Sequence, residues 1–529
     1  MQLGELLVLH GAVTQVQVDQ ALDRQKTSGG LLGENLVALG TLTDEKLREI
    51  VEFFPRYPKT LEETGLSFNF LFNLLLKTMY VMDLETPSEA TESLKISSSI
   101  INDLLEVARE RNLVEVLGSS GVTLAAELRH SLTQLGRDWA TEYLDLCQHV
   151  GPAPVVLEDY CNQIQRQAIG TEQVGRELLT DRLSHLVLKP HLIDELGPAV
   201  NSGRGILIYG PPGNGKTSIA EAIGKSFSGV VYVPHAIEVD GQIVKVYDST
   251  LHKEVTLESK AAAEVEKDKE KSIFLAKEDN NSFIREENYD PRWVACQRPI
   301  LVSGGELTLG MLDLSFNPYS KIYEAPLQVK AMNGVFLLDD FGRQQAKPAD
   351  LLNRWIIPLE KCVDYLALQT GTKFSIPFDE LVIFSTNLSP EDLMDEAFLR
   401  RIPYKIEMTS PSREEFTKIF EILCEQAKIE IPDGIMDFMF KSYYEPNNVK
   451  LASHHPGFIV ERIIDRCRFT GGIPHLDEDL VTFALQNLSI KRDIQPTGGE
   501  GAVTNGKVDA AARPNSAQGG NGASQPARN

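Results

Sequence analysis

The chain has 529 residues, of which 42% are hydrophobic and 24% are charged, and its formal net charge is −23. This length predicts three or four domains, and the negative charge disfavours nonspecific attraction to nucleic acid or to anionic membranes. No run of about eighteen apolar residues could span a bilayer, so we expect no membrane insertion. The sequence starts without the features of a secretion signal, and its six cysteines are scattered. Both observations favour a cytoplasmic protein with free thiols and without structural zinc.

Residues 1–55 contain an internal repeat. The segment Leu3–Gly11 is echoed by Leu32–Gly40, and each copy is followed by a threonine, Thr14 or Thr43, ahead of an amphipathic stretch. Glycine after a short helix and threonine before the next helix are common terminating and capping residues. Two units are too few for a solenoid, so we expect a small all-α domain of paired helices.

This repeat resembles the N-terminal (MshEN-like) domain of type II secretion and type IV pilus ATPases, in which such tandem units can bind cyclic-di-GMP. The family pattern begins with arginine and ends with glutamine. Here Gln2 and Leu31 stand at the arginine positions, and the glutamine is kept as Gln25 but replaced by Phe54 in the second unit. Because the guanidinium groups that would bind phosphate and guanine are absent, a protein-docking role is favoured over cyclic-di-GMP binding.

Residues 63–150 have the pattern of a second small domain. Three helices, two strands and a closing helix are expected in that order. The first five elements are predicted at Phe68–Tyr80, Pro87–Leu94, Ser97–Arg111, Leu113–Gly118 and Arg129–Gly136. The stretch, notably Leu132–Arg137, resembles a winged-helix domain with an α+β fold.

Winged-helix domains often bind DNA through their third helix. Here that helix carries three acidic residues (Asp103, Glu106 and Glu110) beside Arg109 and Arg111. It offers little attraction for phosphates, so an adaptor role is favoured and DNA binding is disfavoured.

A linker at Gly151–Pro154 leads toward the next domain, and a helix is expected over Leu179–Leu196. Farther along, Val230–Val233 reads as a strand. A long insertion, residues 234–330, follows it, and the middle of this insertion, Lys260–Asn281, is strongly charged and is expected to be a solvated helix or loop.

The chain is organised around one glycine-rich segment. The apolar run Gly205–Tyr209 precedes Gly210-Pro-Pro-Gly-Asn-Gly-Lys-Thr217, and a helical pattern follows. This is the Walker A pattern, in which backbone N–H groups bind a polyphosphate. Lys216 would neutralise the β- and γ-phosphates of ATP, and the Thr217 hydroxyl would ligate Mg²⁺. The expected ATP-binding residues are Gly210, Pro211, Pro212, Gly213, Asn214, Gly215, Lys216, Thr217 and Ser218.

A second apolar strand, starting at Asn333, ends in two acids, Asp339 and Asp340. It fits a Walker B motif, in which Asp339 would hold Mg²⁺ and Asp340 would orient or deprotonate the attacking water. Glutamate is the usual residue at the second position. Aspartate is one methylene shorter, which predicts slow hydrolysis.

A third apolar strand, Leu381–Thr386, ends in Asn387, and a helix over Asp395–Arg401 delivers Arg400 and Arg401 ahead of a further strand. In this order the four motifs resemble an AAA+ ATPase. The resemblance implies that Asn387 is sensor 1 and that Arg400 or Arg401 is an arginine finger, which acts on the nucleotide of a neighbouring subunit. A homo-oligomeric ring would follow.

The AAA+ resemblance implies an α/β domain over residues 171–410 and a helical lid over residues 411–492. A sensor 2 arginine is expected near the start of the third lid helix, where Gly457 stands. Arg462 and Arg466 are the candidates for its role. The tail, residues 493–529, is rich in small and polar residues and is expected to be disordered.

The segment Tyr365–Pro377 alternates around Thr370-Gly-Thr and predicts a β-hairpin. A hairpin just before the sensor 1 strand resembles the pre-sensor 1 insertion of the MoxR and magnesium-chelatase branch of AAA+ proteins. In that branch the loops project toward a ring's pore or surface and push on client proteins.

The sequence thus predicts a multidomain protein: an all-α N-terminal domain, a winged helix, a P-loop α/β AAA+ sandwich with a helical lid, and a disordered tail. The favoured function is an ATPase that remodels or assembles a protein partner, with a pilus or secretion system as a client by analogy alone. Two alternatives stay open. One is a DNA-dependent ATPase that uses the winged helix, and the other is a weakly hydrolysing, ATP-switched scaffold.

Overall fold

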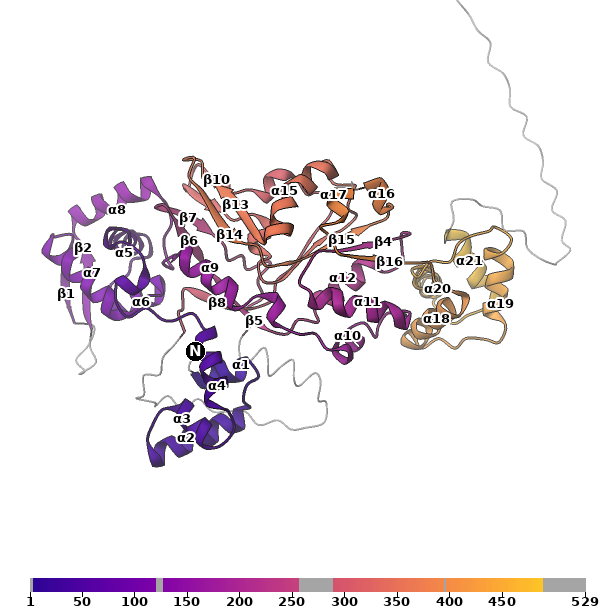
Figure 1. Cartoon of the computed structure of the whole chain (residues 1–529), viewed down its shortest axis with the longest axis horizontal. Coiled ribbons are helices and arrows are strands. Elements are labelled where there is room, and N and C mark those ends of the chain that lie inside the picture. The colour runs from indigo at the N-terminus through magenta and orange to yellow at the C-terminus, as the bar shows by residue number, and fades with distance from the viewer. Residues whose placement is uncertain (1–2, 120–126, 256–288, 394–395, 489–529) are drawn as a thin grey trace, which may run out of the picture.

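The computed structural model describes residues 3–119, 127–255, 289–393 and 396–488. In Figure 1 a parallel sheet with its helices occupies the centre, and a helical lid lies at one end. A second small domain of helices and two strands lies at the other end, and the N-terminal helices project to one side. The charged segment Lys260–Asn281 and the tail from residue 493 lie outside the described residues.

The N-terminal repeat forms four helices: α1 (Leu3–Leu9), α2 (Gln15–Ser28), α3 (Leu32–Ala38) and α4 (Asp44–Phe53). Thr14 and Thr43 cap α2 and α4, each accepting a hydrogen bond from a backbone N–H three residues on. The repeated glycines allow close packing, because a Cβ at Gly4 would lie 2.7 Å from Val18, and one at Gly33 would lie 2.8 Å from Leu47. The equivalent glycines therefore serve the same packing role in both units.

The second domain follows the short 3₁₀ turn η1 (Glu62–Thr64). Its elements are α5 (Phe68–Met82), α6 (Pro87–Leu94), α7 (Ser98–Glu110), β1 (Val114–Ser119), β2 (Leu128–Leu132) and α8 (Gln134–Leu146). The strand predicted to reach Gly136 ends at Leu132 instead. Thr133 caps α8 by accepting a hydrogen bond from the Gly136 N–H, so the helix starts where the strand was expected to continue.

The central sheet is fully parallel, with strand order β16-β4-β15-β12-β9. Its strands are β4 (Ile206–Tyr209), β9 (Ile300–Ser303), β12 (Val335–Leu338), β15 (Leu381–Thr386) and β16 (Tyr404–Glu407). Residues of β4, β12 and β15 are almost all buried, as expected for strands covered on both faces. The edge strand β9 lies within the range predicted as an insertion, so that prediction was wrong for residues 300–303.

Helices cover both faces of this sheet. One apolar cluster joins it to α10 (Arg176–Arg182), α11 (Pro190–Asn201) and α12 (Lys216–Gly224). Another joins it to α14 (Leu327–Lys330), α15 (Pro348–Lys361), α16 (Pro390–Leu393) and α17 (Glu396–Leu399). The single helix predicted over Leu179–Leu196 is wrong: α10 ends at Arg182, and Pro190 opens α11 at its first position, where proline has no N–H to lose.

A second sheet, with strand order β10-β11-β7-β6-β3, adjoins the central one. It comprises β3 (Val155–Val156), β6 (Ala236–Val239), β7 (Gln242–Lys245), β10 (Ser315–Asn317) and β11 (Ile322–Glu324). Two strand pairs pack with this sheet: β5 (Val230–Pro234) with β8 (Trp293–Gln297), and β13 (Val363–Ala367) with β14 (Lys373–Pro377). We call the second sheet and these two pairs together the β-module. Its core also contacts α9 (Leu157–Arg166); the 3₁₀ turns η2 (Ile169–Thr171) and η3 (Leu309–Leu312) lie nearby in sequence.

The β-module holds the N-terminal domains against the rest of the chain. His10 is 3.1 Å from the Tyr232 hydroxyl, and Phe54 packs on the Tyr232 ring. Just after α8 of the second domain, the Gln148 N–H donates to the Ser320 carbonyl at 2.9 Å. Hydrogen bonds and aromatic packing thus join segments that lie far apart in the sequence.

The β-hairpin predicted over Tyr365–Pro377 is present as β13 and β14. Leu366 and Phe374 are buried in the β-module core, and the Gln369 N–H donates to the Tyr323 hydroxyl at 2.9 Å. The hairpin therefore packs along its length on its own chain.

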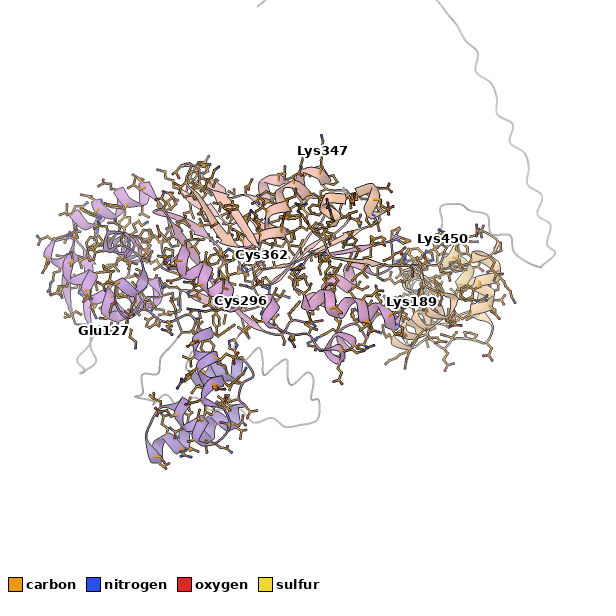
Figure 2. All side chains as sticks on the ribbon, in the orientation of Figure 1. Glu127, Lys189, Cys296, Lys347, Cys362 and Lys450 are labelled. Atoms are coloured by element: carbon orange, nitrogen blue, oxygen red, sulfur yellow. The ribbon has the colours of Figure 1, made fainter. Side chains whose placement is uncertain are left out.

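The lid consists of α18 (Arg413–Ala427), α19 (Ile435–Met439), a π-helical turn at Phe440–Tyr444, α20 (His455–Thr470) and α21 (Glu478–Leu488). Its buried apolar residues form a core separate from the sheet cores, which explains why it can be described as its own domain. Lys189, labelled in Figure 2, lies where the α/β domain meets the lid, and its ammonium donates to the Thr409 hydroxyl at 3.0 Å.

Candidate nucleotide-binding site

The Walker A loop connects the carboxyl end of β4 to the first turn of α12. Gly213 and Gly215 have φ values of +77° and +78°, a region that favours glycine. Gly210 has φ +141°, and a Cβ there would overlap the carbonyl of Met408. Glycine is therefore required at each of these positions, and the loop presents backbone N–H groups at the start of a helix, as an anion-binding loop needs.

Lys216 is buried at the centre of the loop. Its ammonium donates to the carbonyls of Gly210 and Pro211, both at 3.0 Å, and to Oδ1 of Asn387 at 2.6 Å. Burial lowers the pKa of Lys216, and the nearby carboxylates of Asp340 and Asp339 offset part of that effect. The structure thus brings the predicted phosphate-binding lysine against the predicted sensor 1 residue.

The two acids lie directly after β12. Thr217 donates from Oγ1 to Oδ2 of Asp339 at 2.9 Å, and Asn387 donates from Nδ2 to Oδ1 of Asp340 at 2.8 Å. Asp340 has φ +48°, an unfavourable region for a residue with a Cβ. Its carboxylate accepts the hydrogen bond from Asn387, and non-glycine residues in this backbone region cluster at functional sites.

These residues fit a magnesium ion and a phosphate chain. Mg²⁺ prefers oxygen ligands and is usually held by one or two protein side chains together with phosphates and water, which matches the Thr217–Asp339 pair. In the loop, Asn214 is 4% exposed and its Nδ2 has no hydrogen-bond partner among the described residues. A buried, unpaired donor in a phosphate-binding loop fits an anionic ligand.

Arg400 and Arg401 do not contact the Walker A loop of their own chain. They precede β16, which runs parallel to β4, whereas the loop follows β4, so the arginines lie at the opposite edge of the sheet. They line a cavity of about 490 Å³ with Arg204 and Glu380, and Arg401 pairs with Glu360 at 2.9 Å.

The lid arginines proposed for sensor 2 do not reach the loop. Arg462 pairs with Asp465 at 3.3 Å and stacks on Phe458, and Arg466 stacks on Phe483. Their guanidinium groups contact other lid residues in this structure, and a sensor 2 role for either arginine stays a prediction.

Instead, the residues just before α20 contact the loop. The His454 N–H donates to the Gly213 carbonyl at 2.9 Å, and the Ser453 N–H donates to Oδ1 of Asn214 at 3.2 Å. Sequence reasoning missed His454. The signal was present, because a histidine pair directly precedes Pro456 in the first turn of the third lid helix.

Comparison with known proteins gives partial matches. A family described as Domain of unknown function (DUF8689) matches residues 412–487, which form the lid. A vesicle-fusing ATPase from Dictyostelium discoideum is 40% identical over 60 residues, which is 11% of this chain and only 8% of that protein.

Solved structures with partial similarity include NtrX from Brucella abortus, with a TM-score of 0.35 and 15% identity over 60% of this chain and 58% of that chain. Another NtrX structure is in complex with ADP. A RuvB mutant from Thermotoga maritima has a TM-score of 0.30 and 13% identity over 62% of this chain and 74% of that chain. Domain III of the T. maritima replication initiation protein DnaA has a TM-score of 0.29 and 14% identity, covering 58% and 95%. These TM-scores are low, so the interpretation of the site rests on its own geometry.

The parallel sheet, the Walker A loop and the acids after β12 make up a P-loop α/β domain, which confirms this part of the expected fold. Within the described ranges, no helix is long and apolar enough to cross a membrane. The six cysteines, all of which are described, are free.

Proposed function

We propose that this chain is an AAA+ ATPase that binds ATP with Mg²⁺ and hydrolyses it. One observation carries the proposal: five residues from three separate motifs form a connected cluster at one edge of the sheet. Lys216 is hydrogen-bonded to Asn387, Asn387 to Asp340, and Thr217 to Asp339. The Asp340 N–H donates to Oδ1 of Asp339 at 3.0 Å, which joins the two groups. Such an arrangement of a lysine, a hydroxyl and paired acids is what phosphoryl transfer from a bound triphosphate requires.

Each residue has a role that follows from its position. Lys216 and the loop N–H groups bind the phosphates, while Thr217 and Asp339 hold Mg²⁺, which would supply charge neutralisation when bound. Asp340 accepts a hydrogen bond from Asn387, which fixes its carboxylate where it can accept a proton from the attacking water. Asn387 also contacts Lys216, so it connects the phosphate-binding group to the base.

The proposed work of the enzyme is to remodel a protein partner as a homo-oligomer. Arg400 and Arg401 lie far from the Walker A loop of their own chain, which favours action on the nucleotide of a neighbouring subunit. The N-terminal repeat and the winged-helix-like domain are joined to the α/β domain through the β-module, so a partner bound to them could respond to hydrolysis. A pilus or secretion client rests on the resemblance of the repeat alone.

Steady-state ATP turnover of the wild type and of Asp340→Asn tests the proposal. We expect slow but measurable hydrolysis that falls about a hundredfold in the variant, because the base is lost while ATP binding is kept. A pull-down with Asp340→Asn and ATP should then retain the partner protein. Equal and negligible rates would favour the ATP-switched scaffold, and stimulation by duplex DNA would favour a DNA-dependent enzyme.

A further inference from the structure

The lid matches a family of unknown function, and a short segment before α20 contacts the Walker A loop. Ser453 and His454 each donate a backbone hydrogen bond to the loop, to the Asn214 side chain and to the Gly213 carbonyl. The acceptors are adjacent residues in the middle of the phosphate-binding loop. Any rearrangement of the loop on binding a ligand therefore acts directly on the lid.

The side chain of His454 lies over the same loop. A Cβ placed on Gly213 would overlap Nδ1 of His454, so the imidazole is packed against the glycine backbone. The His454 side chain is also exposed, whereas the neighbouring His455 is buried. An exposed imidazole held against a phosphate-binding loop can donate a hydrogen bond to an anion bound there.

The residues beneath His454 fix its position. The His455 ring packs edge-on against the His454 ring at a centroid distance of 4.5 Å, and His455 Nδ1 is 3.1 Å from the Tyr444 hydroxyl. Tyr444 closes the π-helical turn, a feature that often occurs at functional sites. A buried support of this kind restricts the rotamers of the exposed ring, which is how a binding group is pre-organised.

We propose that His454 is the residue through which the lid contacts the phosphates of a bound nucleotide, and that its segment couples the lid to the occupancy of the loop. This inference rests on the proposed ATP-binding function. It assigns a role to a residue of the lid, and it explains why Arg462 and Arg466 can contact other residues within the lid.

Calorimetric titration of the full chain with ATP and Mg²⁺ tests the proposal, using His454→Ala, His454→Leu and His454→Arg. We expect the alanine and leucine variants to bind ATP about tenfold more weakly, since each loses one hydrogen bond to a charged group. The arginine variant should bind within about threefold of the wild type, because it restores a side-chain N–H donor to the phosphates. Leucine keeps the bulk of the side chain, so a purely packing role would be rescued by leucine and not by arginine.

His475→Ala is the matched control, because His475 is a lid histidine that pairs with Asp477; its ATP affinity should equal that of the wild type. Wild-type affinity in His454→Ala or His454→Leu, or an arginine variant as weak as alanine, would overturn the inference. The proposed function fails in a different way: the wild type and Lys216→Ala would then titrate alike, whatever residue stands at position 454.

Discussion

The two ends of the parallel strands in the central sheet differ in the residues that one chain places there. We call them the carboxyl edge and the amino edge. At the carboxyl edge, Lys216, Thr217, Asp339, Asp340 and Asn387 are within hydrogen-bond distance of one another in a connected cluster. At the amino edge, Arg204, Arg400 and Arg401 line a cavity of about 490 Å³, beside the buried Glu380. In our proposal the first edge binds the nucleotide with residues of one chain alone. The second edge presents arginines to the cavity, one of them paired with Glu360.

In the proposed homo-oligomer, two neighbouring subunits would each contribute residues to one hydrolytic site. The chain as a whole is strongly acidic, yet three arginines line one cavity, together with Glu360 and Glu380. Arginine is well suited to phosphate recognition because its guanidinium forms paired hydrogen bonds and stays charged. The carboxyl edge of one subunit and the amino edge of the next would then together form a complete hydrolytic site.

The largest expected change in ATP turnover that tests the roles of the two edges comes from Arg400→Ala or Arg401→Ala. Loss of an arginine finger should lower turnover about a thousandfold, while ATP affinity stays close to that of the wild type, since neither residue contacts the Walker A loop of its own chain. Steady-state kinetics and ATP titration on the same samples separate the two quantities.

Mixing subunits tests whether the finger acts in trans. The Arg variant keeps Asp340 and the Asp340→Asn variant keeps both arginines, so a mixture of the two should regain measurable turnover. A mixture as inactive as its components, or an Arg variant with wild-type turnover, would break the proposed relation between the two edges.

A smaller effect, on the pH dependence of stability, is expected from Glu380. Its side chain is 4% exposed, and its carboxyl oxygens have no hydrogen-bond partner among the described residues. Burial raises its pKa well above the ordinary value, and the negative charges of Asp364 and Asp379 raise it further. The folded state therefore favours the protonated form. Its contribution to stability is complete below the unfolded pKa of about 4.3 and is lost as the pH rises toward the folded pKa.

Glu380→Gln, which is neutral at every pH, should therefore gain stability relative to the wild type between pH 5 and pH 7. The difference should grow by up to about 1.4 kcal/mol per pH unit until the folded pKa is reached. Urea unfolding of both proteins at the two pH values measures it. A constant difference between the proteins would show that Glu380 is not held protonated at this edge of the sheet.

The motifs at the carboxyl edge could be predicted from the sequence, because each consists of a few residues that are adjacent in the chain. The glycines of the Walker A loop, the acids after β12 and Asn387 after β15 all follow apolar runs, and parallel strands bring their carboxyl ends together. The roles given to these residues stay predictions.

Other parts of the fold could not be predicted from the sequence, because they depend on contacts between segments that lie far apart in the chain. β3 is two residues long and pairs with β6, some eighty positions later in the chain, so Gly151–Pro154 read only as a linker. β9 is a short strand within the range predicted as an insertion, and its place beside β12 is set by pairing in the central sheet. The contact of His454 with Gly213 joins two domains, and the sequence offered a histidine pair without indicating which surface it faces.

Titration of the full chain with ATP and Mg²⁺, comparing the wild type with Lys216→Ala, tests the central claim most directly. Lys216 is the buried cation of the loop, so the variant should lose at least about a hundredfold in ATP affinity while keeping the unfolding transition of the wild type. An equally folded Lys216→Ala variant that binds ATP as tightly as the wild type would contradict the account.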